Sequence, residues 1–93
     1  MNHPLFQSAA FIRASKRMFK RQPQARSTIA ETLQRLQENP FDPGLRTHKL
    51  KGDLAGCWAC SAAYDLRIVF RFVPHEGTEA ILLISVGTHD EVY

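Results

Sequence analysis

The sequence of 93 residues predicts one α+β domain, over residues 1–93, in which an N-terminal helical hairpin packs on one face of a small antiparallel β-sheet. Three observations predict this class. Apolar residues recur with the helical period as far as Glu38. Two prolines and a glycine between Asn39 and Gly44 then end any helix. The remainder holds apolar runs of strand length.

The helical half divides into two segments at Pro23, which breaks or restarts a helix. The first segment is expected to begin after Ser8, a residue that suits an N-cap. Its apolar stripe has one polar interruption and consists of Phe11, Ser15, Met18 and Phe19. The second segment runs to about Glu38, and its core stripe consists of Ile29, Leu33 and Leu36. Leu5 and Phe6 are expected to begin a short additional strand before the first helix.

Three strands are expected in the second half, at Cys57–Ala63, Leu66–Val73 and Ala80–Val86. In the second of these, alternation places Leu66, Ile68, Phe70 and Phe72 on one face. Arg67 and Arg71 then point to the face that the helices leave free. The third run is almost continuously apolar, so we expect a central strand that is covered on both faces.

Positive charge is concentrated in the first half of the chain. Residues 1–51 carry ten Lys or Arg against three acidic residues, a net charge of +7, whereas residues 52–93 have a net charge of −4. A basic half of this density fits a polyanionic partner, although a solvated helix face would have the same composition. No apolar run approaches the roughly 20 residues that span a membrane, and no signal peptide is evident, so we expect a cytoplasmic protein without a membrane partner.

The Cys57–Cys60 pair has the spacing of a redox or zinc motif. A redox pair needs its first cysteine at a helix N-terminus, where the thiolate is stabilised. Here the surroundings predict a strand, in which residues three apart point to opposite faces, and there is no second pair to complete a zinc site. We therefore expect two reduced thiols with neither function.

Metal-free RNA cleavage needs a group that takes the 2′-OH proton, a group that gives a proton to the leaving 5′-oxygen, and cations for the charged transition state. The chain contains these chemical types at the positions His48, Asp65, Arg67, His89 and Tyr93. It has no acidic cluster suited to two magnesium ions, so we expect no metal and no cofactor.

Four segments in order carry a resemblance to a known family: Thr47–Gly52 (THKLKG), Gly56–Trp58 (GCW), Asp65–Phe70 (DLRIVF) and Gly87–Tyr93 (GTHDEVY). With the basic first helix and the turn at Asn39, they resemble the RelE/StbE toxins of the RelE/ParE superfamily, and among these the YafQ-like branch. The resemblance spans nearly the whole chain.

The resemblance implies a type II toxin with a cognate antitoxin partner, an endoribonuclease that enters the A site of the 70S ribosome and cuts mRNA without a metal or a small-molecule cofactor. It implies that His48, Asp65, Arg67, His89 and Tyr93 are catalytic. Arg67 would stabilise the charge of the transition state at the phosphate, and Tyr93 would orient the base or the phosphate. The residues expected to bind RNA are Arg13, Lys16, Arg17, Lys20, Arg21, Lys49 and Lys51.

One departure from the family concerns the strand at Cys57–Ala62, where several relatives carry a lysine or a further histidine and this chain has no basic residue. The general base is therefore left open between Asp65 and His48, with His89 as the acid. Two alternatives also stay open: a ParE-like toxin that inhibits gyrase, and a catalytically weak module that only binds an antitoxin.

Overall fold

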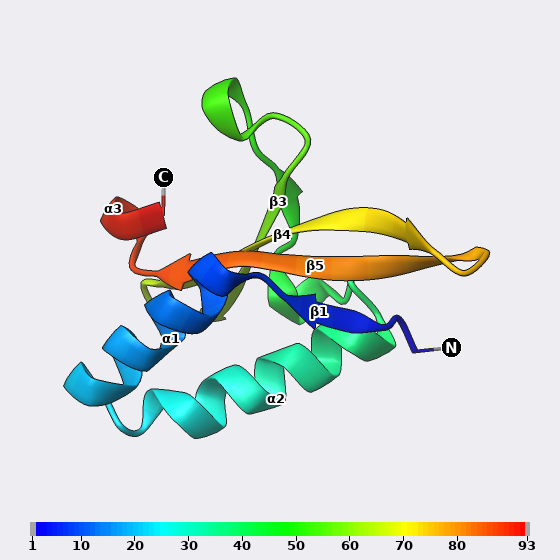
Figure 1. The fold of residues 1–93 in the computed structure, drawn as a ribbon. Helices are drawn as coiled ribbons and strands as arrows, with labels where there is room; N and C mark the ends of the chain where they lie inside the picture. Colours follow the sequence, from blue (N-terminus) through cyan, green and yellow to red (C-terminus); the bar gives the residue numbers. More distant parts are fainter. Residues whose placement is uncertain (1, 93) are drawn as a thin grey trace.

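The computed structural model describes residues 2 to 92 (Figure 1). Two long helices and a five-stranded sheet make up most of this part of the chain, joined by two 3₁₀ turns and closed by a short helix. In chain order the elements are β1 (Leu5–Gln7), α1 (Ala9–Arg21), α2 (Ala25–Glu38), η1 (Pro43–Leu45), β2 (His48–Lys49), η2 (Gly52–Leu54), β3 (Trp58–Ala63), β4 (Leu66–His75), β5 (Thr78–Gly87) and α3 (His89–Val92).

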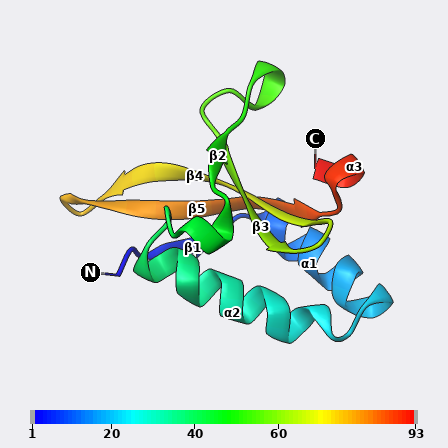
Figure 2. The same ribbon diagram turned by 180° about the vertical axis from the view of Figure 1, so that it is seen from behind.

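The molecule has two layers, with α1 and α2 on one face of the sheet (Figures 1 and 2). Their apolar stripes pack against the inner faces of β3, β4 and β5, and the core between them includes Phe11, Met18, Leu36, Phe70 and Leu83. α3 and the loop that carries η2 project from the opposite side of the sheet in both views. No helix among residues 2 to 92 is long and apolar enough to cross a membrane.

The sheet has the strand order β1-β5-β4-β3-β2. Neighbouring strands from β2 to β5 are antiparallel, but β1 pairs with β5 in parallel, with Leu5 opposite Ile81. The predicted α+β class, the helices on one face and the short first strand are therefore confirmed, while the sheet is mixed rather than purely antiparallel. The reason is that α1 crosses over between β1 and the rest of the sheet, and such a crossover allows parallel pairing.

Ser8 joins α1 to the interior strand β5. Its Oγ accepts the backbone N–H of Phe11 at 3.0 Å, as expected of an N-cap, and donates to the carbonyl of Ile84 at 3.2 Å. Ile84 is the extra residue of a β-bulge, because Val69 pairs with Ser85 whereas Phe70 pairs with Leu83. One hydroxyl thus fixes the start of the helix at the irregular point of β5.

Candidate functional site

The side of the sheet opposite α1 and α2, here called the outer face, brings residues from four strands together. Strand pairing aligns His48 of β2 with Ala59 of β3, then with Val69 of β4 and Ser85 of β5. The next row joins Ser61, Arg67 and Gly87. Because side chains alternate between faces and Ile68 belongs to the core, both rows lie on the outer face. His48 and Arg67, 19 positions apart in the sequence, therefore share one surface.

Val69 lies between these two residues and is only 1% exposed, although neither long helix covers it. In Figure 1, α3 and the η2 loop lie on this side of the sheet. The outer face thus has a buried apolar residue, with the polar side chains of His48 and Arg67 in the same and the next row of the sheet.

The contact between His48 and Arg46 defines the chemistry of the His48 imidazole. Its Nδ1 lies 3.0 Å from the backbone carbonyl oxygen of Arg46. A carbonyl oxygen can only accept a hydrogen bond, so this contact requires a proton on Nδ1. In the neutral ring the lone pair is then on Nε2, which is the tautomer that a general base needs.

Arg67 is partly buried in β4. Its Nη1 donates to the carbonyl oxygen of Ala63 at 3.4 Å, which turns the guanidinium towards the end of β3. Arginine offers five N–H donors in a planar fork, so this one contact leaves most donors for other acceptors. The position on the outer face agrees with the sequence-based prediction that Arg67 points away from the helices.

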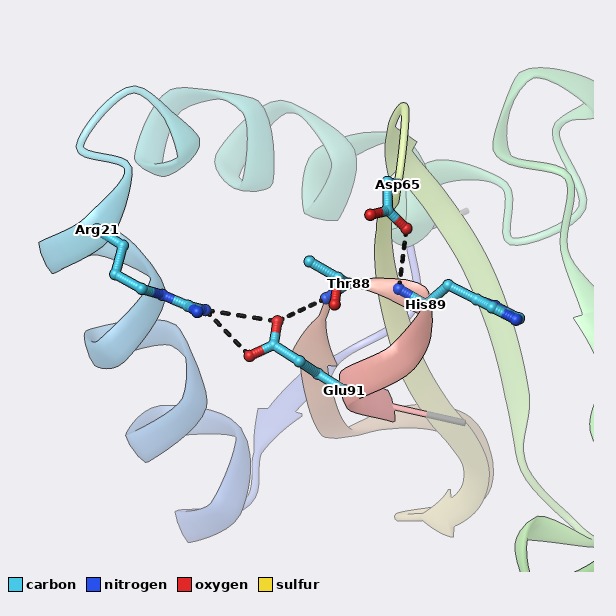
Figure 3. A network of polar contacts seen from close by, with 5 residues as sticks. All are labelled: Arg21, Asp65, Thr88, His89 and Glu91. Carbon is cyan, nitrogen blue, oxygen red and sulfur yellow. Dashed lines mark hydrogen bonds and ion pairs between the residues drawn. The ribbon is translucent and has the colours of Figure 1, made fainter.

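Asp65 and His89 meet where the β3–β4 turn approaches α3 (Figure 3). The Asp65 Oδ1 atom accepts the backbone N–H of His89 at 3.0 Å. The imidazole of His89 points away from the carboxylate in Figure 3, so Asp65 contacts the main chain of the histidine and not its ring. Asp65 has a φ of 56°, a left-handed conformation that aspartate tolerates in a tight turn.

Glu91 binds both the start of α3 and the end of α1 (Figure 3). Its Oε1 accepts the backbone N–H of Thr88 at 2.9 Å, and its Oε2 lies 3.1 Å from Nη2 of Arg21. The hydrogen bond from the Thr88 backbone, with that of Arg21 and its charge, holds the pKa of Glu91 below its ordinary value. Sequence reasoning missed this contact, although Thr88 and Glu91 have the Thr-x-x-Glu spacing of a capping box, which could have revealed it.

The residues predicted to bind RNA do not form one surface in the structure. Arg13, Arg17, Lys16 and Lys20 are exposed on α1, on the side of the sheet opposite His48 and Arg67, and Arg21 is bound to Glu91. Lys49 follows His48 in β2 but points to the other face, with its Nζ 5.4 Å from the ring centre of Trp58. Lys51 is exposed beside the η2 loop. Tyr93, the remaining predicted site residue, lies outside the described residues.

The two cysteines are free thiols in different environments. Cys60 is completely buried in the core, and burial raises the pKa of its thiol to about 12. Cys57 precedes β3 and is half-buried. Within residues 2 to 92, no group of three or more histidine, cysteine or acidic side chains is placed to hold a metal ion.

The model of one protein family matches residues 4–93, and its description is "Bacterial toxin of type II toxin-antitoxin system, YafQ". Solved structures share the fold. YafQ from Escherichia coli BL21(DE3) is 13% identical, with a TM-score of 0.79 over 98% of each chain. A metal-bound toxin from Helicobacter pylori is 24% identical, with a TM-score of 0.78 over the whole of both chains. The Escherichia coli DinJ–YafQ toxin–antitoxin complex gives 13% identity and a TM-score of 0.77 over 100% of this chain and 99% of that chain. Among curated proteins, no sequence matches.

Proposed function

The chain belongs to the YafQ family of bacterial type II toxins, and from this premise we propose that it is a metal-independent endoribonuclease that cuts mRNA on the ribosome. The observation that carries the catalytic part of the proposal is the His48 tautomer on the same sheet face as Arg67. A histidine with its acceptor nitrogen at Nε2, on the same sheet face as a guanidinium, supplies a base and a cation of the kind that attack of a 2′-OH on a phosphodiester requires.

In the proposed reaction, Nε2 of His48 accepts the proton of the 2′-OH, whose oxygen attacks the adjacent phosphorus. The P–O bond to the 5′-oxygen of the next nucleotide breaks, and the imidazolium of His89 donates a proton to that oxygen. The products are a 2′,3′-cyclic phosphate and a free 5′-OH. Arg67 stabilises the negative charge that builds up on the non-bridging phosphate oxygens. Each proton has a donor and an acceptor, so the step needs no metal-bound water.

Asp65 has a positioning role in this proposal. The sequence left the base open between Asp65 and His48, but the Asp65 carboxylate contacts the His89 backbone N–H at 3.0 Å. That contact fixes the first residue of α3 and with it the direction of the imidazole. His48, which has the base tautomer, is therefore assigned as the base and Asp65 as the residue that orients the acid.

A cognate antitoxin is the second proposed partner of this chain. The support is family membership, together with the Escherichia coli complex in which DinJ, the antitoxin, is bound to YafQ. Apart from Arg21, the positive charges on α1 lie on the helix side of the sheet, and we assign Arg13, Lys16, Arg17 and Lys20 to ribosomal RNA. An antitoxin that covers these charges would bind less tightly as the salt concentration increases.

Cleavage of mRNA on programmed ribosomes tests the proposal. Wild-type protein is expected to cut within the A-site codon, and to do so in EDTA. His89→Ala and Arg67→Ala are expected to lower the rate by about 10²- to 10⁴-fold, the usual contribution of an acid–base group or of a charge-stabilising donor. Arg26→Ala, a change on the opposite side of the sheet, is the matched control and should cut normally.

The outcomes separate the parts of the proposal. A wild-type protein that cuts neither ribosome-bound nor free RNA contradicts the nuclease assignment, and inhibition of gyrase by the same preparation would indicate a ParE-like toxin instead. Loss of cutting in EDTA contradicts only the metal-independent mechanism. Full activity in His89→Ala contradicts the choice of the acid and leaves the reaction class intact.

A further inference from the structure

The β3–β4 turn borders a hollow of about 400 Å³, here called the turn hollow. Among the residues that line it are Arg46, Ser61, Tyr64 and Arg67. Ser61 and Arg67 pair with each other on the catalytic face, and the carbonyl oxygen of Arg46 contacts His48 of the same face. The turn hollow is thus a direct continuation of the proposed site, and its size suits a small ligand.

Charge distinguishes this hollow from its neighbour. Among residues 2 to 92, those that line the turn hollow include two arginines and no acidic side chain. A second hollow of about 420 Å³ also borders Tyr64, and Asp65 is the only charged residue in this described range that lines it. An anionic group is therefore attracted to the first hollow and repelled from the second. The planar guanidinium groups favour phosphate, whose oxygens they can bind in pairs.

Tyr64 is the most exposed large hydrophobic side chain in the described part of the chain, with a relative exposure of 102%. It occupies a two-residue turn between Ala63 and Leu66, so its backbone is held by the paired strands on both sides. The ring of Tyr64 is not part of the hydrophobic core. A rigidly mounted and fully exposed aromatic ring next to cationic side chains is the combination that binds single-stranded nucleic acids, because bases stack on the ring while the backbone contacts the charges.

We propose that the turn hollow is a nucleotide subsite of the toxin, in which Arg46 and Arg67 hold a phosphate next to the scissile one and Tyr64 stacks on the base of a flanking nucleotide. This inference rests on the proposed ribonuclease function. Arg67 reaches both phosphates because it lies on the outer face and also lines the hollow. The subsite binds RNA through stacking and phosphate contacts, so it contributes affinity and register but little preference for one base.

The test uses a short single-stranded RNA with a 2′-O-methyl group at the cleavage position, so that it binds without being cut. Fluorescence anisotropy gives the Kd for wild type, Tyr64→Ala, Tyr64→Phe, Arg46→Ala and Arg46→Lys. Tyr64→Ala should weaken binding by about tenfold, since stacking on one ring is lost, and Tyr64→Phe should restore it. Arg46→Ala should also lower the salt dependence of log K by about 0.7, the value for one phosphate contact in a single strand.

An abasic nucleotide gives the decisive comparison. Removal of the flanking base from the RNA should weaken binding to wild type about as much as Tyr64→Ala does, and should not weaken the Tyr64→Ala variant further. Phe41→Ala is the control for Tyr64, because Phe41 is also an exposed ring (55%) but lies outside the turn hollow. The far-ultraviolet circular dichroism of each variant shows that it is folded.

Two further outcomes distinguish this inference from the function on which it rests. Wild-type protein that cuts mRNA, with Tyr64→Ala and Arg46→Ala variants that bind and cut like wild type, overturns the subsite and leaves the ribonuclease intact. Wild-type protein that neither binds the RNA nor cuts mRNA overturns both. Additive effects of the abasic nucleotide and Tyr64→Ala would mean that the base contacts another side chain, which also contradicts the assignment to Tyr64.

Discussion

The Nη2 atom of Arg21 lies 3.1 Å from Oε2 of Glu91, and this ion pair joins the last residue of α1 to the short helix that carries His89. Glu91 also accepts the N–H of Thr88, so a single carboxylate links two helices and closes the first turn of α3. A helix of four residues has little stability of its own. Its position depends on contacts such as these.

Glu91→Gln is expected to reduce the free energy of unfolding at pH 7 by about 0.2–1 kcal/mol, because an exposed ion pair contributes no more than this. The pKa of Glu91 is lowered in the fold, so its contribution is complete above the ordinary value of 4.5 and is lost as the pH falls through the lowered value. The difference between variant and wild type should therefore shrink below pH 4.5. Urea unfolding at several pH values measures it.

Asp90→Asn serves as the control for Glu91→Gln, since it removes one carboxylate from the same helix and leaves the Thr88 and Arg21 contacts in place. Amide hydrogen exchange supplies a second, local readout. Faster exchange at Thr88 in Glu91→Ala, which has no side-chain acceptor for that N–H, with no change in Asp90→Asn, is the expected result. Equal exchange at Thr88 in wild type and Glu91→Ala would contradict the role given to Glu91.

Asp65 variants distinguish a positioning role from a general base. Asp65→Asn keeps an oxygen that can accept the His89 N–H and tolerates the left-handed backbone, so it should retain most of the activity. Asp65→Gly also tolerates that backbone but has no acceptor, and it should lower kcat by tenfold or more because His89 is no longer held. Single-turnover cleavage measures both. Equally severe losses in the two variants would indicate instead that the carboxylate acts as the base.

His48→Ala should lower the cleavage rate by about 10²- to 10⁴-fold with little change in the Kd for RNA. A base acts only when it is deprotonated, so wild-type activity should fall on the acid side of a bell-shaped pH profile, and that limb should disappear in the variant. His75→Ala is a suitable control, because His75 lies at the far end of β4, opposite Thr78. An unchanged acid limb in His48→Ala would assign the base elsewhere.

The two thiols should react with a thiol reagent at very different rates. Cys57 is half-buried and should react in the native protein, whereas Cys60 has 0% exposure and a pKa of about 12, so it has almost no thiolate at pH 8. We expect rapid modification of one thiol per chain and of the second only in denaturant. Cys57→Ser should abolish the rapid phase, and rapid modification of both thiols would contradict the core position of Cys60.

Met18 and Ile12 provide a matched pair on α1 for testing the core. Met18 is 1% exposed and belongs to the core cluster, and its replacement by alanine should cost about 2–5 kcal/mol of unfolding free energy. Ile12 is 37% exposed, so Ile12→Ala should cost clearly less. Urea unfolding of both variants checks this. Similar losses at the two positions would contradict the way in which α1 packs on the sheet.

Sequence patterns were sufficient for the elements that have a clear period. The alternation of Ile68 and Phe70 with Arg67 predicted β4 and its two faces, because neighbouring side chains in a strand must point in opposite directions. The stripe from Phe11 to Met18 likewise predicted the buried side of α1. Both patterns are local in the sequence, and they arise because each element must bury one of its faces.

Contacts between distant polar groups could not be predicted in the same way. Asp65 and His89 are 24 positions apart, and Arg21 and Glu91 are 70 apart, so no periodicity connects either pair. Lys49 points to the opposite face of the sheet from His48, and this depends on the register of a strand of only two residues. The parallel pairing of β1 depended on where α1 returns the chain to the sheet. These features follow from the tertiary arrangement, which local patterns in a single sequence do not predict.

The interior position of β5 in the sheet also affects when the protein can become toxic. This strand lies between β1 and β4, although it is the last strand along the chain. Before β5 leaves the ribosome, β1 has no partner strand, Arg67 has no Gly87 beside it, and α3 has not been made. Folding of this domain can finish only after β5 and α3 have been made, because these contacts are all long in sequence. A toxin built in this order has no complete outer face while its earlier strands are being synthesised, so its toxicity begins late in its own synthesis.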